Sequence, residues 1–143
     1  MEKMRVLVAN DPRVYREVIA DGLKELRPLI EVSTAEPDEL EREVARLRPH
    51  LIICSRSIST ATQARCLAWV VLYPDGEDRA DVGGARGRTS LLVGVGVNDL
   101  LWVVDETEQR WRSSHKDKPR SAWTLRPRSG VGQTGSKLPR RTL

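Results

Sequence analysis

The chain has 143 residues, the length of one ordinary domain, with a net charge of +4 and no phenylalanine. It contains no run of about 18 apolar residues, as a membrane span requires, and residues 1–6 lack the apolar core of a signal peptide. Cys54 and Cys66 lie too far apart in the chain for a C-x-x-C motif, which disfavours a disulfide framework or a zinc site. We expect Cys54 to be buried and Cys66 exposed. A cytoplasmic protein without a membrane segment, metal or cofactor is predicted.

The charge is distributed unevenly along the chain. Residues 1–109 hold 14 Lys/Arg and 19 Asp/Glu, whereas residues 110–143 hold 10 Lys/Arg and one Asp. Hydrophobic periodicity ends at Arg110, and such a stretch buries too little apolar surface to offset its chain entropy. We therefore predict one folded domain over residues 1–109 and a basic, disordered tail over residues 110–143.

The first elements alternate between strand and helix. Residues 5–9 form a valine-rich apolar run, which predicts a buried strand ended by Asn10-Asp11-Pro12. Apolar residues then recur with a period near 3.6 over residues 13–26, which predicts a helix. Asp11 is expected to cap its N-terminus, because an aspartate oxygen can accept from the first free N–H groups of a helix. An alternative role for Asp11 is a cation ligand at the edge of the sheet.

A second strand and helix repeat this order. Residues 29–33 are a strand candidate, and a helix is predicted from Glu36 to about Leu47, with pairs Asp38–Arg42 and Glu43–Arg46 on its wet face. The apolar run over residues 51–54 is typical of a central parallel strand. Strand, helix, strand, helix, strand predicts an α/β fold with a doubly wound, mostly parallel sheet.

The second half departs from this alternation. A strand is predicted over residues 68–73, but residues 74–90 contain too many glycines and a proline for a helix. We predict a turn, a short antiparallel strand near residues 79–82 and another strand over residues 91–95. A hairpin would then stand where a fourth helix belongs. A last helix is predicted from Asn98 or Asp99 to about Gln109.

Over residues 4–108, this element order and the turn Val8-Ala9-Asn10-Asp11-Pro12 resemble the receiver domain of bacterial response regulators. The resemblance implies a flavodoxin-like strand order. A working receiver carries two acidic residues after its first strand, an aspartate after its third, a Ser/Thr after its fourth and a lysine after its fifth. In this sequence the first four of those positions correspond to Asn10, Asp11, Ser55 and Tyr73. The fifth-strand region, residues 91–96, has no lysine.

The resemblance therefore implies a dismantled phosphoryl site. Phosphoryl transfer to a side chain needs a carboxylate nucleophile and a divalent metal, and magnesium prefers carboxylate ligands. Ser55 without a base is a weak nucleophile, and Arg56 adds positive charge beside it. His50 lies at the other end of the strand, so a hydrolase is disfavoured. We predict a non-enzymatic pseudo-receiver that regulates signalling by binding an unidentified protein, independently of phosphate.

The basic tail supports an alternative function, which is weak and salt-sensitive binding of nucleic acid. Basic side chains neutralise phosphates, and Trp111 and Trp123 can stack on bases. The candidate residues are Arg110, Arg112, Lys116, Lys118, Arg120, Arg126, Arg128, Arg140 and Arg141. A solvated tail without such a role, or a sequence read in a shifted frame, would have the same composition.

Overall fold

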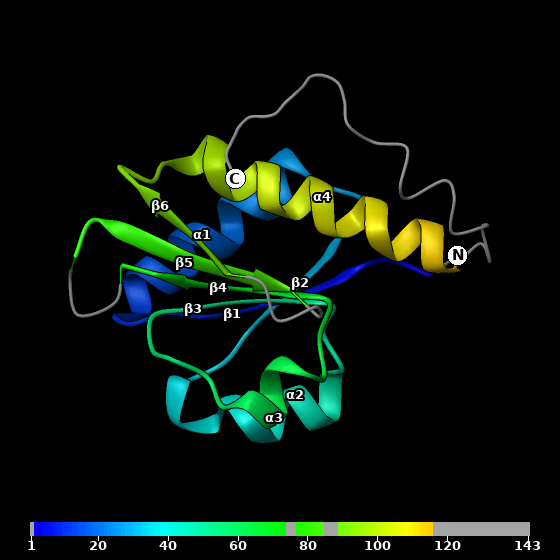
Figure 1. The fold of residues 1–143 in the computed structure, drawn as a ribbon, viewed down its shortest axis with the longest axis horizontal. Helices are drawn as coiled ribbons and strands as arrows, with labels where there is room; N and C mark the ends of the chain where they lie inside the picture. Colours follow the sequence, from blue (N-terminus) through cyan, green and yellow to red (C-terminus); the bar gives the residue numbers. More distant parts are fainter. Residues whose placement is uncertain (1, 74–76, 85–88, 116–143) are drawn as a thin grey trace. The chain divides into compact units, whose positions relative to one another are not determined.

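The structure is a computed structural model that describes residues 2–73, 77–84 and 89–115 (Figure 1). The chain divides into two units, residues 1–111 and 112–143. The elements are β1 (Arg5–Ala9), α1 (Arg13–Leu26), β2 (Glu31–Thr34), a 3-10 turn (Pro37–Glu39), α2 (Leu40–Leu47), β3 (Leu51–Cys54), α3 (Thr60–Gln63), β4 (Ala68–Leu72), β5 (Arg79–Gly84), β6 (Thr89–Val93) and α4 (Val97–His115).

The strands form one sheet in the order β2-β1-β3-β4-β5-β6. The first four strands in this order pair in parallel, with Val6 opposite Leu51 and Ile52 opposite Trp69 as examples of the register. Strands β5 and β6 then pair antiparallel to their neighbours. The predicted α/β class, the mostly parallel sheet and the hairpin after β4 are thus confirmed.

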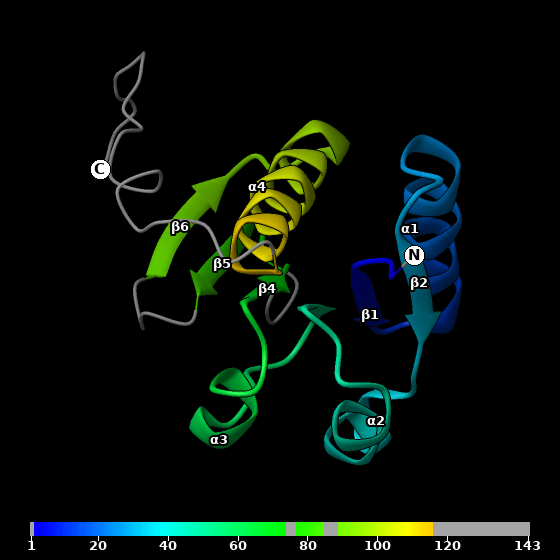
Figure 2. The same cartoon turned by 90° about the vertical axis from the view of Figure 1, so that its right-hand side faces the viewer.

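Helices cover both faces of the sheet, with α1 and α4 on one side and α2 and α3 on the other (Figures 1 and 2). Alternate residues of each central strand therefore enter different cores. Val8 and Ile53 pack with Leu23 of α1 and Val104 of α4, whereas Ile52 lies in the core beneath α2. Burial on both faces explains why β1, β3 and β4 are continuous apolar runs instead of alternating ones.

Three helices differ from the sequence prediction. The helix predicted from Glu36 begins as the 3-10 turn, and α2 itself starts at Leu40. Helix α3 was not predicted; Ser59 begins it, and its hydroxyl accepts a hydrogen bond from the Thr62 backbone N–H. The predicted end of the last helix at Gln109 is wrong, because α4 continues to His115. Trp111 is only 6% exposed and its ring lies 5.1 Å from that of His50. The burial of Trp111 therefore extends the folded part of the chain past residue 110, the predicted start of the tail.

No helix in the described part of the chain is long and apolar enough to cross a membrane.

Trp111 and Trp102 provide a matched test of the longer helix, because both lie in α4 but only Trp111 is buried. We expect Trp111→Ala to lower the free energy of unfolding by about 3–5 kcal/mol, since it removes a large side chain from a packed core. Trp102→Ala should change it by less than about 0.5 kcal/mol. Equal midpoints for the two variants in urea denaturation would contradict this packing.

A close approach between β4 and β5 requires glycine at position 83. The Trp69 ring, which is 5% exposed, lies where a Cβ on Gly83 would stand. Gly83 lies opposite Trp69 in the antiparallel pair, so the Trp69 ring lies against the backbone of β5 at Gly83. Any larger residue would have to displace this buried ring.

We expect Gly83→Ala to destabilise the fold by about 1–3 kcal/mol through overpacking. Gly22→Ala is the control, because a Cβ at this helical position would meet nothing within 4 Å. It should stabilise the fold by roughly 0.5–1 kcal/mol, as alanine is the better helix former. Thermal unfolding shows whether each substitution lowers or raises the stability of the fold. An unchanged stability of Gly83→Ala would show that the Trp69 ring can move.

Candidate functional site

The chain segments that follow β1 and β3 leave the sheet at the same edge. Ala9 lies opposite Cys54 in the parallel pair, so Asn10 and Ser55 come directly after neighbouring strand ends. Ligands of open α/β sheets bind outside the carboxyl ends of the strands. The candidate site therefore lies at this edge.

Asn10 is the buried residue of the site, directly after the end of β1. Its side chain is fully buried, and neither its Oδ1 nor its Nδ2 has a hydrogen-bond partner among the described residues. Its backbone carbonyl accepts a hydrogen bond of 3.3 Å from Arg16, which is itself buried. Arg16 also forms an ion pair of 3.3 Å with Glu36. Asn10, which corresponds to the first acidic residue of the receiver pattern, thus places an uncharged amide next to a buried cation.

Asp11 connects the two strand ends. Its backbone N–H donates to Ser55 Oγ at 3.0 Å, and its carboxylate accepts from Arg56 Nη2 at 3.0 Å. The prediction that Asp11 caps α1 is wrong, because Pro12 is the N-cap and no side chain makes the capping bond. The Asp11 carboxylate bonds to Arg56 instead.

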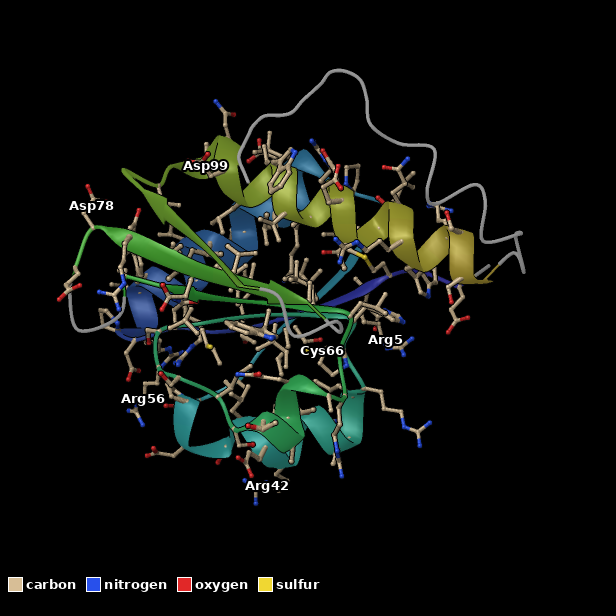
Figure 3. All side chains as sticks on the ribbon, in the orientation of Figure 1. Arg5, Arg42, Arg56, Cys66, Asp78 and Asp99 are labelled. Carbon is tan, nitrogen blue, oxygen red and sulfur yellow. The ribbon has the colours of Figure 1, made fainter. Side chains whose placement is uncertain are left out.

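Arg56 bridges two carboxylates from different loops. Its Nη1 donates to Asp38 at 3.0 Å, in addition to the bond with Asp11, and these two hydrogen bonds raise the pKa of the guanidinium (Figure 3 labels Arg56). The predicted Asp38–Arg42 pair is therefore wrong, since Arg42 pairs with Glu39.

The other predicted pair, between Glu43 and Arg46, is confirmed at 2.5 Å. The hydrogen bond from Arg46 lowers the pKa of the Glu43 carboxyl.

Tyr73 contacts residues other than Asp11, Ser55 and Arg56. It has a left-handed backbone with a φ of 55°, its hydroxyl donates to the Val95 carbonyl at 2.7 Å, and its ring lies 5.6 Å from that of Tyr15. The structure thus links Asp11 with Ser55, next to Asn10, whereas Tyr73 lies in the wall of a hollow between α1 and α4. Sequence reasoning did not place Asp38 at the site, because Asp38 comes from the 3-10 turn after a different strand, β2.

This arrangement limits the chemistry of the edge. Within the described part of the chain, no three His, Cys, Asp or Glu side chains lie close enough together to hold a metal ion. The carboxylates of Asp11 and Asp38 at this edge both pair with the Arg56 guanidinium. Ser55 Oγ accepts the Asp11 N–H, and no hydrogen bond among the described residues joins its own proton to a carboxylate base.

Both cysteines are buried, Cys54 at 2% and Cys66 at 5% exposure, so the expectation that Cys66 is exposed is wrong. Cys66 follows α3, which the sequence did not predict, and it packs in the core on that side of the sheet. Burial raises the pKa of the Cys54 thiol to about 12 and that of Cys66 to about 11.

Two of the basic residues predicted to bind nucleic acid belong to α4. Arg110 Nη1 would lie 3.0 Å from a Cβ on Gly84, which places Arg110 beside β5 and not in a tail. Arg112 is in the last turns of α4. The other seven candidates, Lys116, Lys118, Arg120, Arg126, Arg128, Arg140 and Arg141, lie outside the described residues.

Comparison of the chain with models of protein families, with curated proteins and with solved structures found no match.

The raised thiol pKa values predict inert cysteines in the folded protein. The thiolate is the reactive form, and at pH 8 a thiol with a pKa near 12 is ionised in roughly one molecule in ten thousand. We expect iodoacetamide to leave both thiols unmodified over an hour at pH 8 and to alkylate both in guanidinium chloride. Rapid alkylation of the folded protein, detected by intact mass, would contradict the burial of Cys54 and Cys66.

Proposed function

We propose that this protein is a pseudo-receiver, a receiver-like domain that regulates signalling by binding another protein and does not accept phosphate. The strand order supports the scaffold. Its first four strands follow the order 2-1-3-4, which is also the start of the doubly wound 2-1-3-4-5 arrangement. The fifth strand is antiparallel here, so the proposal likens the parallel half of the sheet to a receiver.

The observation that carries the proposal is the guanidinium of Arg56 between Asp11 and Asp38. In a phosphoryl-accepting site, a divalent cation offsets the charge of the carboxylates and of the incoming phosphoryl oxygens. Here a side chain of the protein supplies a cation at the strand edge. A guanidinium donates in a fixed fork geometry and has no empty coordination position, so it can tie the two loops together but cannot activate a phosphoryl donor as a metal does.

The position of the nucleophile supports the same proposal. Ser55 stands where the receiver pattern has its aspartate, and its Oγ accepts the Asp11 N–H at 3.0 Å. A serine hydroxyl needs an adjacent base to attack phosphorus, and the nearest carboxylate in this bonding network, that of Asp11, is paired with Arg56. Arg56 and Ser55 therefore fasten the loops after β1 and β3 to one another. An edge without phosphoryl chemistry suits a module whose activity lies in its surface contacts.

Incubation with acetyl phosphate and magnesium, followed by intact mass, tests this function. We expect the mass of the full chain to stay unchanged under conditions that phosphorylate a working receiver treated in parallel. Arg56→Ala should also remain unlabelled, because removal of the cation does not restore the missing carboxylate nucleophile. A stoichiometric phosphoryl adduct on the wild-type chain, mapped to Asp11 or Ser55, would overturn the proposal.

A further inference from the structure

An apolar stripe runs along the exposed side of α1. Val14, Val18, Gly22 and Leu26 follow one another at intervals of four residues, so they lie on one side of the helix. Val14 is 66% exposed, Val18 62% and Leu26 46%. Gly22 leaves open space in the middle of the stripe, because a Cβ there would meet nothing within 4 Å. Several large apolar side chains exposed together on one helix are typical of an interaction surface.

The stripe borders a pocket between α1 and the start of α4. Val18, Ile19 and Gly22 of α1 line it, together with Leu72, Val97 and Leu100. Its volume is about 170 Å³, similar to the roughly 150 Å³ of an apolar cavity that holds benzene. The pocket therefore has room for one aromatic or branched aliphatic side chain. Val97, on its α4 rim, is 53% exposed, so the apolar surface continues across to the second helix.

Acidic residues surround this surface. Glu17, Asp21 and Glu25 are exposed and form a row beside the apolar stripe, again at intervals of four residues. Arg13 pairs with Glu17 at 2.8 Å, whereas Asp21 and Glu25 have no ion-pair partner among the described residues. On α4, residues 97–109 hold four acidic residues and no basic one, and one of the four, Asp105, pairs with Arg27 at 2.8 Å. The ligand that complements this surface is both apolar and positively charged.

The same acidic row disfavours a second copy of this chain as the ligand. In a two-fold symmetric dimer each surface patch meets itself. An antiparallel pair of α1 helices would then bring the row of Glu17, Asp21 and Glu25 against the same row of the other copy. Like charges at such contacts are destabilising. A partner with lysine or arginine beside its apolar residues would instead gain from the contact.

We propose that the exposed side of α1 and the α1–α4 pocket bind a basic amphipathic helix of a partner protein. One large apolar side chain of this helix enters the pocket, and its lysines or arginines face Asp21 and Glu25. An amphipathic helix that lays its apolar side in a groove is a recurrent mode of peptide recognition. This inference rests on the proposed function as a protein-binding module, for which it names the surface and the class of partner.

Calorimetric titration of the full chain with a synthetic amphipathic helix of leucine and lysine, about 18 residues long, tests the inference. A matched peptide with glutamate at every lysine position is the control. We expect the lysine peptide to bind in a saturable manner and the glutamate peptide not to bind. Asp21→Lys/Glu25→Lys should weaken binding at least about tenfold, and Val18→Ser about fivefold, since each removes a contact worth about 1 kcal/mol or more.

The matched control variant is Glu31→Lys/Glu41→Lys, which makes the same change of charge at exposed positions of β2 and α2. It should weaken binding less than twofold. Equal weakening by the two double variants would show nonspecific attraction and overturn the inference, as would equal binding of both peptides. Sedimentation of the free protein as a dimer that Val18→Ser abolishes would assign the surface to a second copy instead.

Absence of peptide binding would also overturn the inference, as would protection of α1 in the free chain by residues 116–143. Neither outcome affects the pseudo-receiver proposal, which a phosphoryl adduct would overturn. Thermal unfolding of each variant identifies any loss of fold, and Asp21, Glu25 and Val18 are exposed enough for substitution to leave the core intact.

Discussion

Strands β1 and β3 are buried on both faces, and this constraint organises the rest of the molecule. Leu7 and Ile52 face one core, and Val8 and Ile53 face the other, so each side of the sheet needs a layer of helices. The parallel register of the two strands then brings Asn10 and Ser55 to one edge. The bonds from Asp11 to Ser55 and Arg56 follow from the position of these two strand ends, whereas Asp38 reaches Arg56 from the 3-10 turn after β2.

The parts of the fold that the sequence predicted are those with a strong local pattern. The bounds of β1, α1 and β3 agree with the predicted ranges, because continuous apolar runs and a 3.6-residue period reflect burial directly. Helix α3 has only four residues and too short a pattern to detect. The last turns of α4 were missed because a charged sequence surrounds Trp111, whose burial depends on His50 and the core and not on its neighbours in the chain.

The location of the candidate site could be predicted from the sequence, but its side-chain hydrogen bonds and ion pairs could not. Asn10, Asp11 and Ser55 follow strands that pair, so their proximity follows from the parallel sheet. The bond from Arg56 to Asp38 joins residues 18 apart, and local spacing favoured Arg42 as the partner of Asp38. Ion pairs on a surface are decided by which loops meet, and no helical periodicity encodes this. The exposure of the apolar stripe on α1 was also not predicted, because the helix has more apolar positions than the sheet covers.

Together these features describe a domain with a bridged strand edge and an exposed helix face that is both apolar and acidic. The edge holds a cation of the protein between two carboxylates, and the face combines exposed apolar side chains with acidic ones, of which Glu17 pairs with Arg13. On this account, loss of phosphoryl chemistry and retention of a docking surface are compatible, because the residues that carry them do not overlap.

The central claim is that Arg56 supplies the cation at the strand edge in place of a divalent metal. It is tested most directly by titrating the ¹⁵N-labelled full chain with magnesium and beryllofluoride and following the backbone amide resonances of Asp11 and Ser55. The account predicts that these resonances stay in place apart from a small, linear drift with ionic strength. Saturable shifts at both residues at millimolar magnesium would contradict it.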